Sequence, residues 1–234
     1  MDPLASIAAE PARAGVFLDI DGVLAPIVPR PEDARVPDET RTELRRLVGR
    51  YRLVACVTGR PSSVARELVG VPELTYVGEH GLELDVRAQE WGPRIQAFAA
   101  ESPWPAERKP LSVAFHYRTA ADHGEARATL ETVAAAALEQ GFRTRWGRMV
   151  LEVLPPVDAS KGTAVRSLLT ETGLQRALYA GDDTTDLDGF AALDGLELAV
   201  RVAVASAESP SELARRADLV VPDPAAFLRL LRRL

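Results

Sequence analysis

The chain has 234 residues, of which 47% are hydrophobic and 26% charged, with a formal net charge of −6. This length fits one large domain, or one domain with a moderate insertion, and the hydrophobic share is sufficient for a full core. The negative charge argues against binding to nucleic acid, whose phosphate backbone requires clustered lysine and arginine. No apolar run approaches the roughly 20 residues of a membrane helix, so a membrane is not expected as a partner either.

The first residues and the cysteine usage suggest a cytoplasmic location. Residues 1–14 lack the apolar stretch and cleavage pattern of a signal peptide, and we expect them to form a loose tail. The single cysteine, Cys56, lies inside an apolar run and should pack in the core. The three histidines do not have the spacing of a zinc site.

Short apolar runs alternate with amphipathic stretches along most of the chain, which is the pattern of βαβ units around a parallel sheet. The predicted strands, in chain order, are 15–18, 53–57, 75–77, 177–180, 196–200 and 219–221. Helix starts are indicated by local capping chemistry. The signals are Ser62 or Ser63, Ser160, a capping box at Ser209 with Pro210 as the first helical residue, and Asp223 ahead of the last helix.

The middle of the chain has a different pattern. Residues 111–118 alternate as a half-buried strand should, and an alanine-rich helix is expected from 122 to 140. The segments 142–146 and 148–153 are separated by Gly147 and predict a hairpin. We therefore expect a small α+β unit at 83–156, inserted into a core formed by 1–82 and 157–234.

Two acidic clusters follow predicted strands. Asp19 and Asp21 follow the first strand, and the run Gly181-Asp182-Asp183-Thr184-Thr185-Asp186 follows the fourth. Strand ends of a parallel sheet are where α/β proteins bind ligands, so these carboxylates should share one sheet edge. They would repel one another without a hard cation, and oxygen-rich sites suit Mg²⁺.

Asp19 and Asp21 have the spacing for covalent chemistry on phosphorus. On a continuing strand the two side chains would share a face, and Gly22 lets the chain turn away sharply. One carboxylate can attack phosphorus to give an aspartyl-phosphate. The other can protonate the departing alkoxide and then deprotonate the attacking water. The alternative interpretation is an ordinary Asp-Gly turn at the end of a strand.

Two further segments could hold a phosphate group. Thr58, Gly59 and Arg60 end the second predicted strand and supply a hydroxyl, an uncovered amide and a cation. Lys161 stands at a helix start, where an ammonium group and main-chain amides can hold an anion together. Each segment alone could be a Thr-Gly turn or a surface lysine. The occurrence of all four motifs, in order, on one predicted sheet edge favours catalysis.

This set of motifs resembles the haloacid dehalogenase-like phosphatases. The resemblance implies a Rossmann-like core in which Asp19 is the nucleophile, Asp21 is the general acid/base, and Thr58 and Lys161 bind the phosphoryl group. It also implies a magnesium ion, whose ligands would be Asp19, the main-chain carbonyl of Asp21, Asp182 and, through water, Asp186. The insertion occupies the position of that family's type-two cap.

Finer features resemble one branch, the trehalose-6-phosphate phosphatases. Residues 19–27 look like the opening of that branch, from which they depart by Ile20 in place of an aromatic residue and Val23 in place of threonine. The segments 78–81, 116–118, 150–153 and 182–186 are also similar to it. The resemblance implies hydrolysis of trehalose 6-phosphate to trehalose and phosphate.

A disaccharide phosphate also requires recognition of its neutral hydroxyl groups, which carboxylates and guanidinium groups can provide. Arg148 and Glu152 lie four positions apart and on a strand would face the same side, which we expect to face the sugar. Further candidates are Arg60, Glu79, His80 and Arg118. Each of these residues, Arg148 and Glu152 included, could instead belong to a surface ion pair.

Two other functions remain open from the sequence. A phosphatase for another sugar or polyol phosphate, such as sucrose 6-phosphate, would use the same chemistry. A non-catalytic regulatory subunit of a sugar-phosphate synthase would keep the fold, although it need not retain both a nucleophile and an acid/base. The oligomeric state is also open, and we take a monomer as the simplest expectation.

Overall fold

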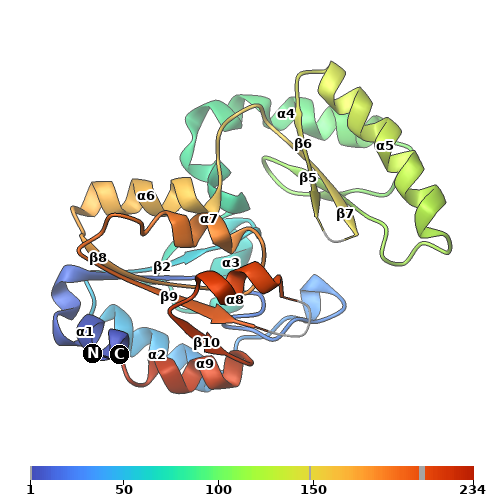
Figure 1. Cartoon of the computed structure of the whole chain (residues 1–234). Helices are drawn as coiled ribbons and strands as arrows, with labels where there is room; N and C mark the ends of the chain where they lie inside the picture. Colours follow the sequence, from blue (N-terminus) through green and yellow to red (C-terminus); the bar gives the residue numbers. More distant parts are fainter. Residues whose placement is uncertain (1, 148, 206–208) are drawn as a thin grey trace. The chain divides into compact units, whose positions relative to one another are not determined.

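The computed structural model describes residues 2–147, 149–205 and 209–234 (Figure 1). The chain forms two compact units, Met1–Gly81 with Ala159–Leu234 and the inserted Leu82–Asp158. The sequence pattern predicts a division into 1–82 with 157–234 and 83–156. Arg148, one of the predicted sugar ligands, lies outside the described residues.

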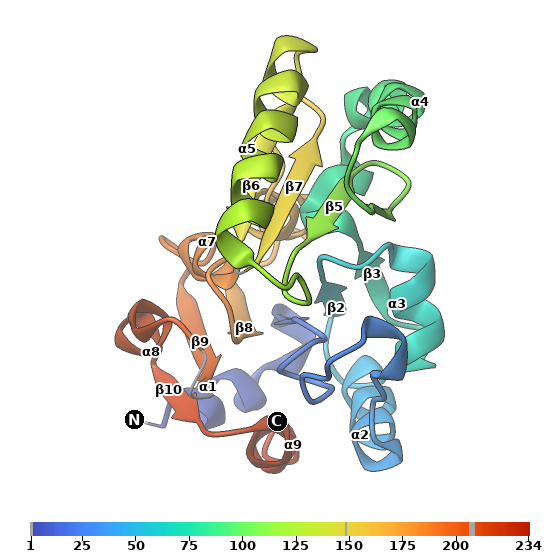
Figure 2. The same ribbon diagram turned by 90° about the vertical axis from the view of Figure 1, so that its right-hand side faces the viewer.

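The first unit is built on a parallel six-stranded sheet of order β10-β9-β8-β1-β2-β3, with helices on both faces (Figures 1 and 2). Its strands are β1 (Ala14–Leu18), β2 (Leu53–Val57), β3 (Thr75–Val77), β8 (Arg176–Gly181), β9 (Leu198–Val204) and β10 (Leu219–Val221). One face packs against α1 (Pro3–Ala9), α2 (Asp38–Val48), α3 (Ser62–Val69) and α9 (Pro224–Leu231). The other packs against α6 (Lys161–Thr172), α7 (Asp186–Ala191) and α8 (Ser211–Arg216). Short 3₁₀ segments span Pro11–Arg13, Pro31–Asp33 and Glu79–Leu84, the last interrupted by non-helical backbone at His80 and Gly81.

Burial on both faces explains why the central strands read as continuous apolar runs. All five residues of β1 are buried. Val16 and Leu18 pack in the core on one side of the sheet, whereas Phe17 packs in the core on the other. Cys56, in the neighbouring strand β2, is buried as predicted. A parallel sheet covered by helices on both faces has this pattern.

The second unit is a four-stranded antiparallel sheet of order β4-β5-β7-β6 covered by two helices. Its elements are α4 (Val86–Glu101), β4 (Glu107–Arg108), β5 (Val113–His116), α5 (His123–Glu139), β6 (Arg143–Gly147) and β7 (Val150–Leu154). The predicted hairpin is confirmed, because β6 and β7 pair antiparallel. Neither α4 nor β4 is among the predicted elements. The predicted fold class, a Rossmann-like parallel sheet with an inserted small α+β unit, is confirmed.

Two helix starts agree with the capping signals in the sequence. Ser160 caps α6 in a capping box, because its hydroxyl accepts from the Thr163 main-chain N at 3.2 Å while the Thr163 hydroxyl accepts from the Ser160 N at 2.8 Å. Asp223 caps α9 by accepting from the Ala226 N at 2.6 Å.

Two other predicted caps are wrong for a shared reason. Pro61 is the N-cap of α3 and Ser62 is already helical, while Pro210 is the N-cap of α8 and no capping box forms at Ser209. In both cases the proline is the last non-helical residue before the helix. Its side chain has no hydrogen-bonding group, so no side chain caps the helix. The serine signals therefore lie one residue away from the position they would need.

The prediction of a loose tail at residues 1–14 is also wrong. Asp2 caps α1 by accepting from the Leu4 N at 3.1 Å, and Leu4 and Ile7 are buried against the sheet. The guanidinium group of Arg176, in β8, donates to the Ser6 carbonyl at 2.9 Å. The helix is too short for its two apolar anchors to give a recognisable period, and tertiary packing holds it in place.

Within the described residues, no helix combines the length and the apolar character that a membrane span needs. A cytoplasmic location stays a prediction from the sequence.

Candidate active site

The candidate site lies at the carboxyl end of the parallel sheet, where the strand order reverses. β1 has β2 on one side and β8 on the other, with Leu18 beside Cys56 and Ala180. The first residue beyond β1, Asp19, continues this register by donating its main-chain N–H to the Ala180 carbonyl at 3.0 Å. Such switch points are where doubly wound sheets bind ligands.

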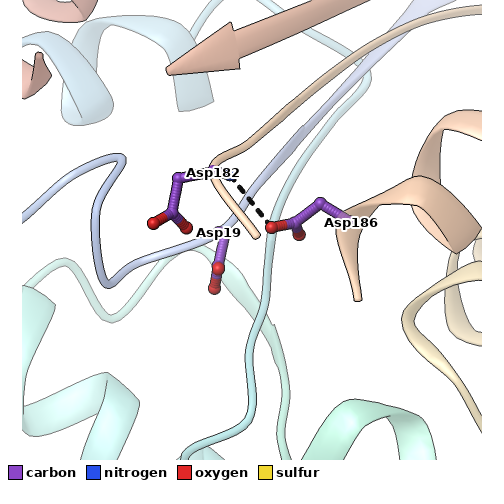
Figure 3. A group of neighbouring side chains, drawn as sticks. All are labelled: Asp19, Asp182 and Asp186. Atoms are coloured by element: carbon purple, nitrogen blue, oxygen red, sulfur yellow. Dashed lines mark hydrogen bonds between the residues drawn. The ribbon is translucent and has the colours of Figure 1, made fainter. Parts of the chain in front are cut away.

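Three carboxylates converge at this point (Figure 3). Oxygen atoms of Asp19, Asp182 and Asp186 lie within 4.8 Å of one another; Asp19 and Asp186 are buried and Asp182 is partly buried. Gly22 makes the approach possible, because its φ of 78° is left-handed and a Cβ there would overlap the Asp182 carboxylate. The structure therefore brings together the two acidic clusters of the sequence.

Lys161 supplies a buried positive charge to this cluster. Its Nζ donates to Asp19 Oδ2 and to Asp186 Oδ1, both at 2.7 Å, and its side chain is 2% exposed. Burial alone would lower the pKa of Lys161, but the carboxylates of Asp186 and Asp19 outweigh it and hold this pKa above the ordinary value. Lys161 is therefore a permanent cation beside Asp19.

The Asp186 carboxylate is fixed by four hydrogen bonds. Oδ1 accepts from Lys161 and from the Tyr179 hydroxyl, at 2.7 Å each, and Oδ2 accepts from the main-chain N–H groups of Asp182 and Asp183, at 3.0 Å each. Burial, reinforced by the neighbouring carboxylate of Asp186, raises the pKa of Tyr179 well above its usual range. The phenol therefore stays a hydrogen-bond donor. Tyr179 is not among the residues predicted from the sequence, because it reads as one more apolar residue of a buried strand.

The remaining charge imbalance indicates a cation site. Burial raises the pKa of Asp19 to about 7, with Lys161 opposing the shift and Asp186 adding to it. Burial and the charge of Asp19 raise the pKa of Asp182 to about 9. Further positive charge is needed before both carboxyl groups can ionise near neutral pH. A donor set of carboxylate oxygens suits a hard divalent cation, so these residues fit the metal that the sequence resemblance implies.

Arg60 lies against Asp21, a contact that the sequence pattern does not predict. The Nε of Arg60 donates to Asp21 Oδ2 and its Nη2 donates to Oδ1, both at 2.7 Å. The main-chain N of Arg60 donates to the hydroxyl of Thr58, which is buried. The predicted phosphate segment and the predicted acid/base are thus joined by an ion pair.

Glu79 and His80 belong to a left-handed turn beside the Thr58–Arg60 segment. Glu79, His80 and Gly81 have φ values of 47°, 56° and 96°. The Glu79 N donates to the Arg60 carbonyl at 3.0 Å and the His80 N donates to the Thr58 carbonyl at 2.9 Å. The His80 imidazole occupies the space that a Cβ at Gly59 would need. Positive φ at two consecutive non-glycine residues is strained backbone, which clusters at functional sites.

The other described candidates lie in the second unit. Glu152 is on β7, between Leu151 and Val153, which pack against the helices, so its side chain is on the opposite face of the sheet. It accepts from Arg145 Nε at 2.7 Å, and Lys109 Nζ lies 3.9 Å from its other oxygen. Neither of these basic partners is predicted from the sequence.

Arg118 follows β5 and is exposed. Its carbonyl lies 3.2 Å from the Nε2 of His123, at the start of α5. The structure therefore places Arg118 and Glu152 in one unit and the other described candidates in the other unit.

Comparison with known proteins gives the family. The trehalose-phosphatase family model matches residues 17–104 and 105–224. The chain is 32% identical over 240 residues to the trehalose-phosphate phosphatase of Mycobacterium marinum, covering 86% of this chain and 60% of that protein. It is 28% identical over 264 residues to the probable trehalose-phosphate phosphatase 2 of rice (Oryza sativa subsp. japonica), covering 95% of this chain and 68% of that protein.

A solved structure supports the same assignment at the level of the fold. The crystal structure of a trehalose-6-phosphate phosphatase related protein superimposes with a TM-score of 0.73 at 24% identity, covering 93% of this chain and 95% of that one. The family match extends over both units of the structure. The chain belongs to the trehalose-phosphatase family.

Proposed function

We propose that this protein is a magnesium-dependent phosphatase that converts trehalose 6-phosphate to trehalose and phosphate through an aspartyl-phosphate. The observation that carries the proposal is the placement of Asp19 at the switch point of the sheet, against the buried cation Lys161 and beside Asp182. The names of the relatives support the choice of substrate.

The phosphoryl group would be held by Lys161, at the start of α6, and by the segment that follows β2. Lys161 offsets charge between the phosphate and Asp19, while Thr58 and Gly59 offer a hydroxyl and a main-chain amide. The metal would be held by Asp19, Asp182 and the main-chain carbonyl of Asp21, with Asp186 behind them. When bound, Mg²⁺ supplies positive charge that reduces the repulsion between the phosphate and the carboxylates.

Asp19 and Asp21 would divide the chemistry between them. In the first half, Asp19 forms a bond to phosphorus, the bond from phosphorus to the sugar oxygen breaks, and Asp21 delivers a proton to that oxygen. In the second half, Asp21 accepts a proton from water, the water oxygen bonds to phosphorus, and Asp19 is released. Lys161 remains charged throughout and stabilises both transition states.

We further propose that the inserted unit acts as a type-two cap that recognises the sugar. Glu152 supports this role, because Arg145 and Lys109 hold its carboxylate on the face of the second sheet opposite the helices. A carboxylate accepts hydrogen bonds from sugar hydroxyl groups, and the neighbouring cations donate to them. Arg118, Glu79 and His80 remain candidates for sugar contacts, and the role of Arg148 stays a prediction from the sequence.

The proposal is tested by phosphate release from trehalose 6-phosphate, glucose 6-phosphate, sucrose 6-phosphate and 4-nitrophenyl phosphate, each with Mg²⁺ and with a chelator. We expect rapid, Mg²⁺-dependent release from trehalose 6-phosphate and only slow release from the other esters. Preference for another sugar phosphate would keep the mechanism and reject the substrate. Failure to hydrolyse any ester would reject the enzyme assignment.

Glu152→Ala is expected to lower kcat/KM for the sugar phosphate by roughly 10- to 100-fold, as the loss of a charged hydrogen bond predicts. The same variant should change kcat/KM for 4-nitrophenyl phosphate much less, because that substrate offers no sugar hydroxyl groups. Glu131→Ala, which removes an exposed carboxylate paired with Arg127 on α5, serves as the control. Equal losses of kcat/KM on both substrates would show that Glu152 does not contact the sugar.

A further inference from the structure

Arg60 and Asp21 form a two-point ion pair between the ends of two neighbouring strands. The two hydrogen bonds, Nε to Oδ2 and Nη2 to Oδ1, are both 2.7 Å long. The side chains are 15% and 31% exposed, so the pair is only partly screened by water. A planar guanidinium group that meets both oxygens of a carboxylate fixes its orientation as well as its distance.

The main chain of Arg60 is itself anchored. Its N–H donates to the Thr58 hydroxyl at 3.3 Å, and its carbonyl accepts from the Glu79 N at 3.0 Å. Arg60 is therefore held by the Thr58–Arg60 segment on one side and by the left-handed turn on the other. In contrast, Asp21 lies on a turn beyond β1, where Gly22 takes a φ of 78° and the strand no longer dictates the direction of the side chain.

We propose that Arg60 is a positioning residue for Asp21, which it aims at the leaving oxygen, and that it is not a phosphate ligand. This inference rests on the proposed function of Asp21 as the acid/base. The Nε and Nη2 edge of the guanidinium group, which could otherwise bind a phosphate, is hydrogen-bonded to Asp21. A carboxylate has about four lone-pair sites, so two remain for proton exchange with the leaving oxygen or with water.

Leaving-group chemistry separates the two roles of Arg60. A sugar alkoxide is a strong base and must receive a proton as it departs, whereas 4-nitrophenolate is a weak base and departs without one. The ratio kcat/KM reports the reaction up to the departure of the leaving group. A residue that positions the acid should therefore affect the sugar phosphate selectively, whereas a phosphate ligand should affect both substrates alike.

The experiment compares kcat/KM of the Mg²⁺-loaded wild type, Arg60→Gln and Arg60→Lys on trehalose 6-phosphate and 4-nitrophenyl phosphate. For Arg60→Gln we expect a loss of about 100-fold on the sugar phosphate, at the lower end of what general acid catalysis contributes. The loss on 4-nitrophenyl phosphate should be at least about tenfold smaller. Arg60→Lys should recover only part of the kcat/KM that Arg60→Gln loses on the sugar phosphate, because an ammonium group cannot make the two-point contact.

Arg201→Gln is the matched control. Arg201 is also mostly buried, with a side chain 18% exposed, and donates to Asp194 at 2.6 Å. Its loss should lower the melting temperature without changing the ratio of the kcat/KM values for the two substrates. Equal losses on both substrates in Arg60→Gln would show a phosphate ligand and overturn the inference, as would unchanged activity on both.

The same measurements separate failure of the positioning role from failure of the proposed function. If the wild type hydrolyses neither sugar phosphates nor the aryl ester, the proposed function fails. If the wild type is active and Arg60→Gln lowers kcat/KM equally for both substrates, only the positioning role fails. Should Arg60→Gln not fold, the ratio measured for Arg60→Lys decides in the same way.

Discussion

Replacing Asp19 with asparagine is expected to lower kcat by at least about a thousandfold, the scale on which loss of a catalytic nucleophile acts. The amide oxygen is a much weaker nucleophile than a carboxylate, so the aspartyl-phosphate should not form. Wild-type protein quenched during turnover should carry a phosphoryl group that hydroxylamine removes. The Asp19→Asn protein should carry none.

The variant should nevertheless fold, because the change removes a charge from a crowded acidic site. Asp19 accepts from the Ile20 main-chain N at 2.7 Å and from Lys161, and asparagine can keep one of these bonds. Lys161 keeps its bond to Asp186. A melting temperature close to that of the wild type would establish that the loss is chemical.

Asp194→Asn is the control for Asp19→Asn. It makes the same chemical change at an exposed carboxylate that pairs with Arg201. Its activity should equal that of the wild type. Turnover by Asp19→Asn near the wild-type rate would refute the nucleophile assignment.

The strands of the parallel sheet are predictable because their signal is local. Strands β2 and β3 have the bounds that the sequence predicts, since each is a short apolar run enclosed by turns. Strand β9 extends to Val204, beyond the predicted end at residue 200, because Arg201 interrupts the apolar run. That arginine is accommodated in the strand by hydrogen bonds to Asp194 and Asp218, which lie 7 and 17 positions away in the sequence.

The candidate site is only partly visible in the sequence for a related reason. Motifs at strand ends identify which residue types reach the sheet edge, and the structure brings Asp19, Lys161 and Asp186 into contact there. Pairings between side chains depend on tertiary geometry instead. Arg60 reaches Asp21 across 39 positions, and Tyr179 contacts Asp186 through a single hydroxyl within the apolar run 177–180. A pattern of residue types carries no information about either contact.

The raised carboxyl pKa values predict that metal-free stability falls as the pH rises. In the unfolded chain an aspartate ionises near its ordinary pKa of 3.8, whereas burial raises the pKa of Asp19 to about 7 and that of Asp182 to about 9. At pH values between the unfolded pKa of 3.8 and the folded pKa values of about 7 and about 9, the folded protein therefore binds more protons than the unfolded chain. Stability from these groups is fully present below the unfolded pKa and is lost as the pH rises through the folded values.

Mg²⁺ should reverse this trend, because its binding requires ionised carboxylates and so displaces protons. We expect the increase in melting temperature on adding Mg²⁺ to be larger at pH 8.5 than at pH 6. The apparent affinity should rise by up to about tenfold per pH unit for each proton displaced. Thermal unfolding with Mg²⁺ and with chelator at both pH values, together with calorimetry in buffers of different ionisation enthalpy, measures both effects.

Asp182→Asn provides the matched variant for this linkage. It removes the carboxyl group with the higher pKa, so the metal-free protein should lose less stability between pH 6 and pH 8.5, and the Mg²⁺-dependent increase should shrink. A Mg²⁺ effect of equal size at the two pH values would contradict the linkage. Retention of the full effect in Asp182→Asn would instead remove Asp182 from the metal site, because a variant that lacks a metal ligand cannot gain as much stability from Mg²⁺ at high pH as the wild type.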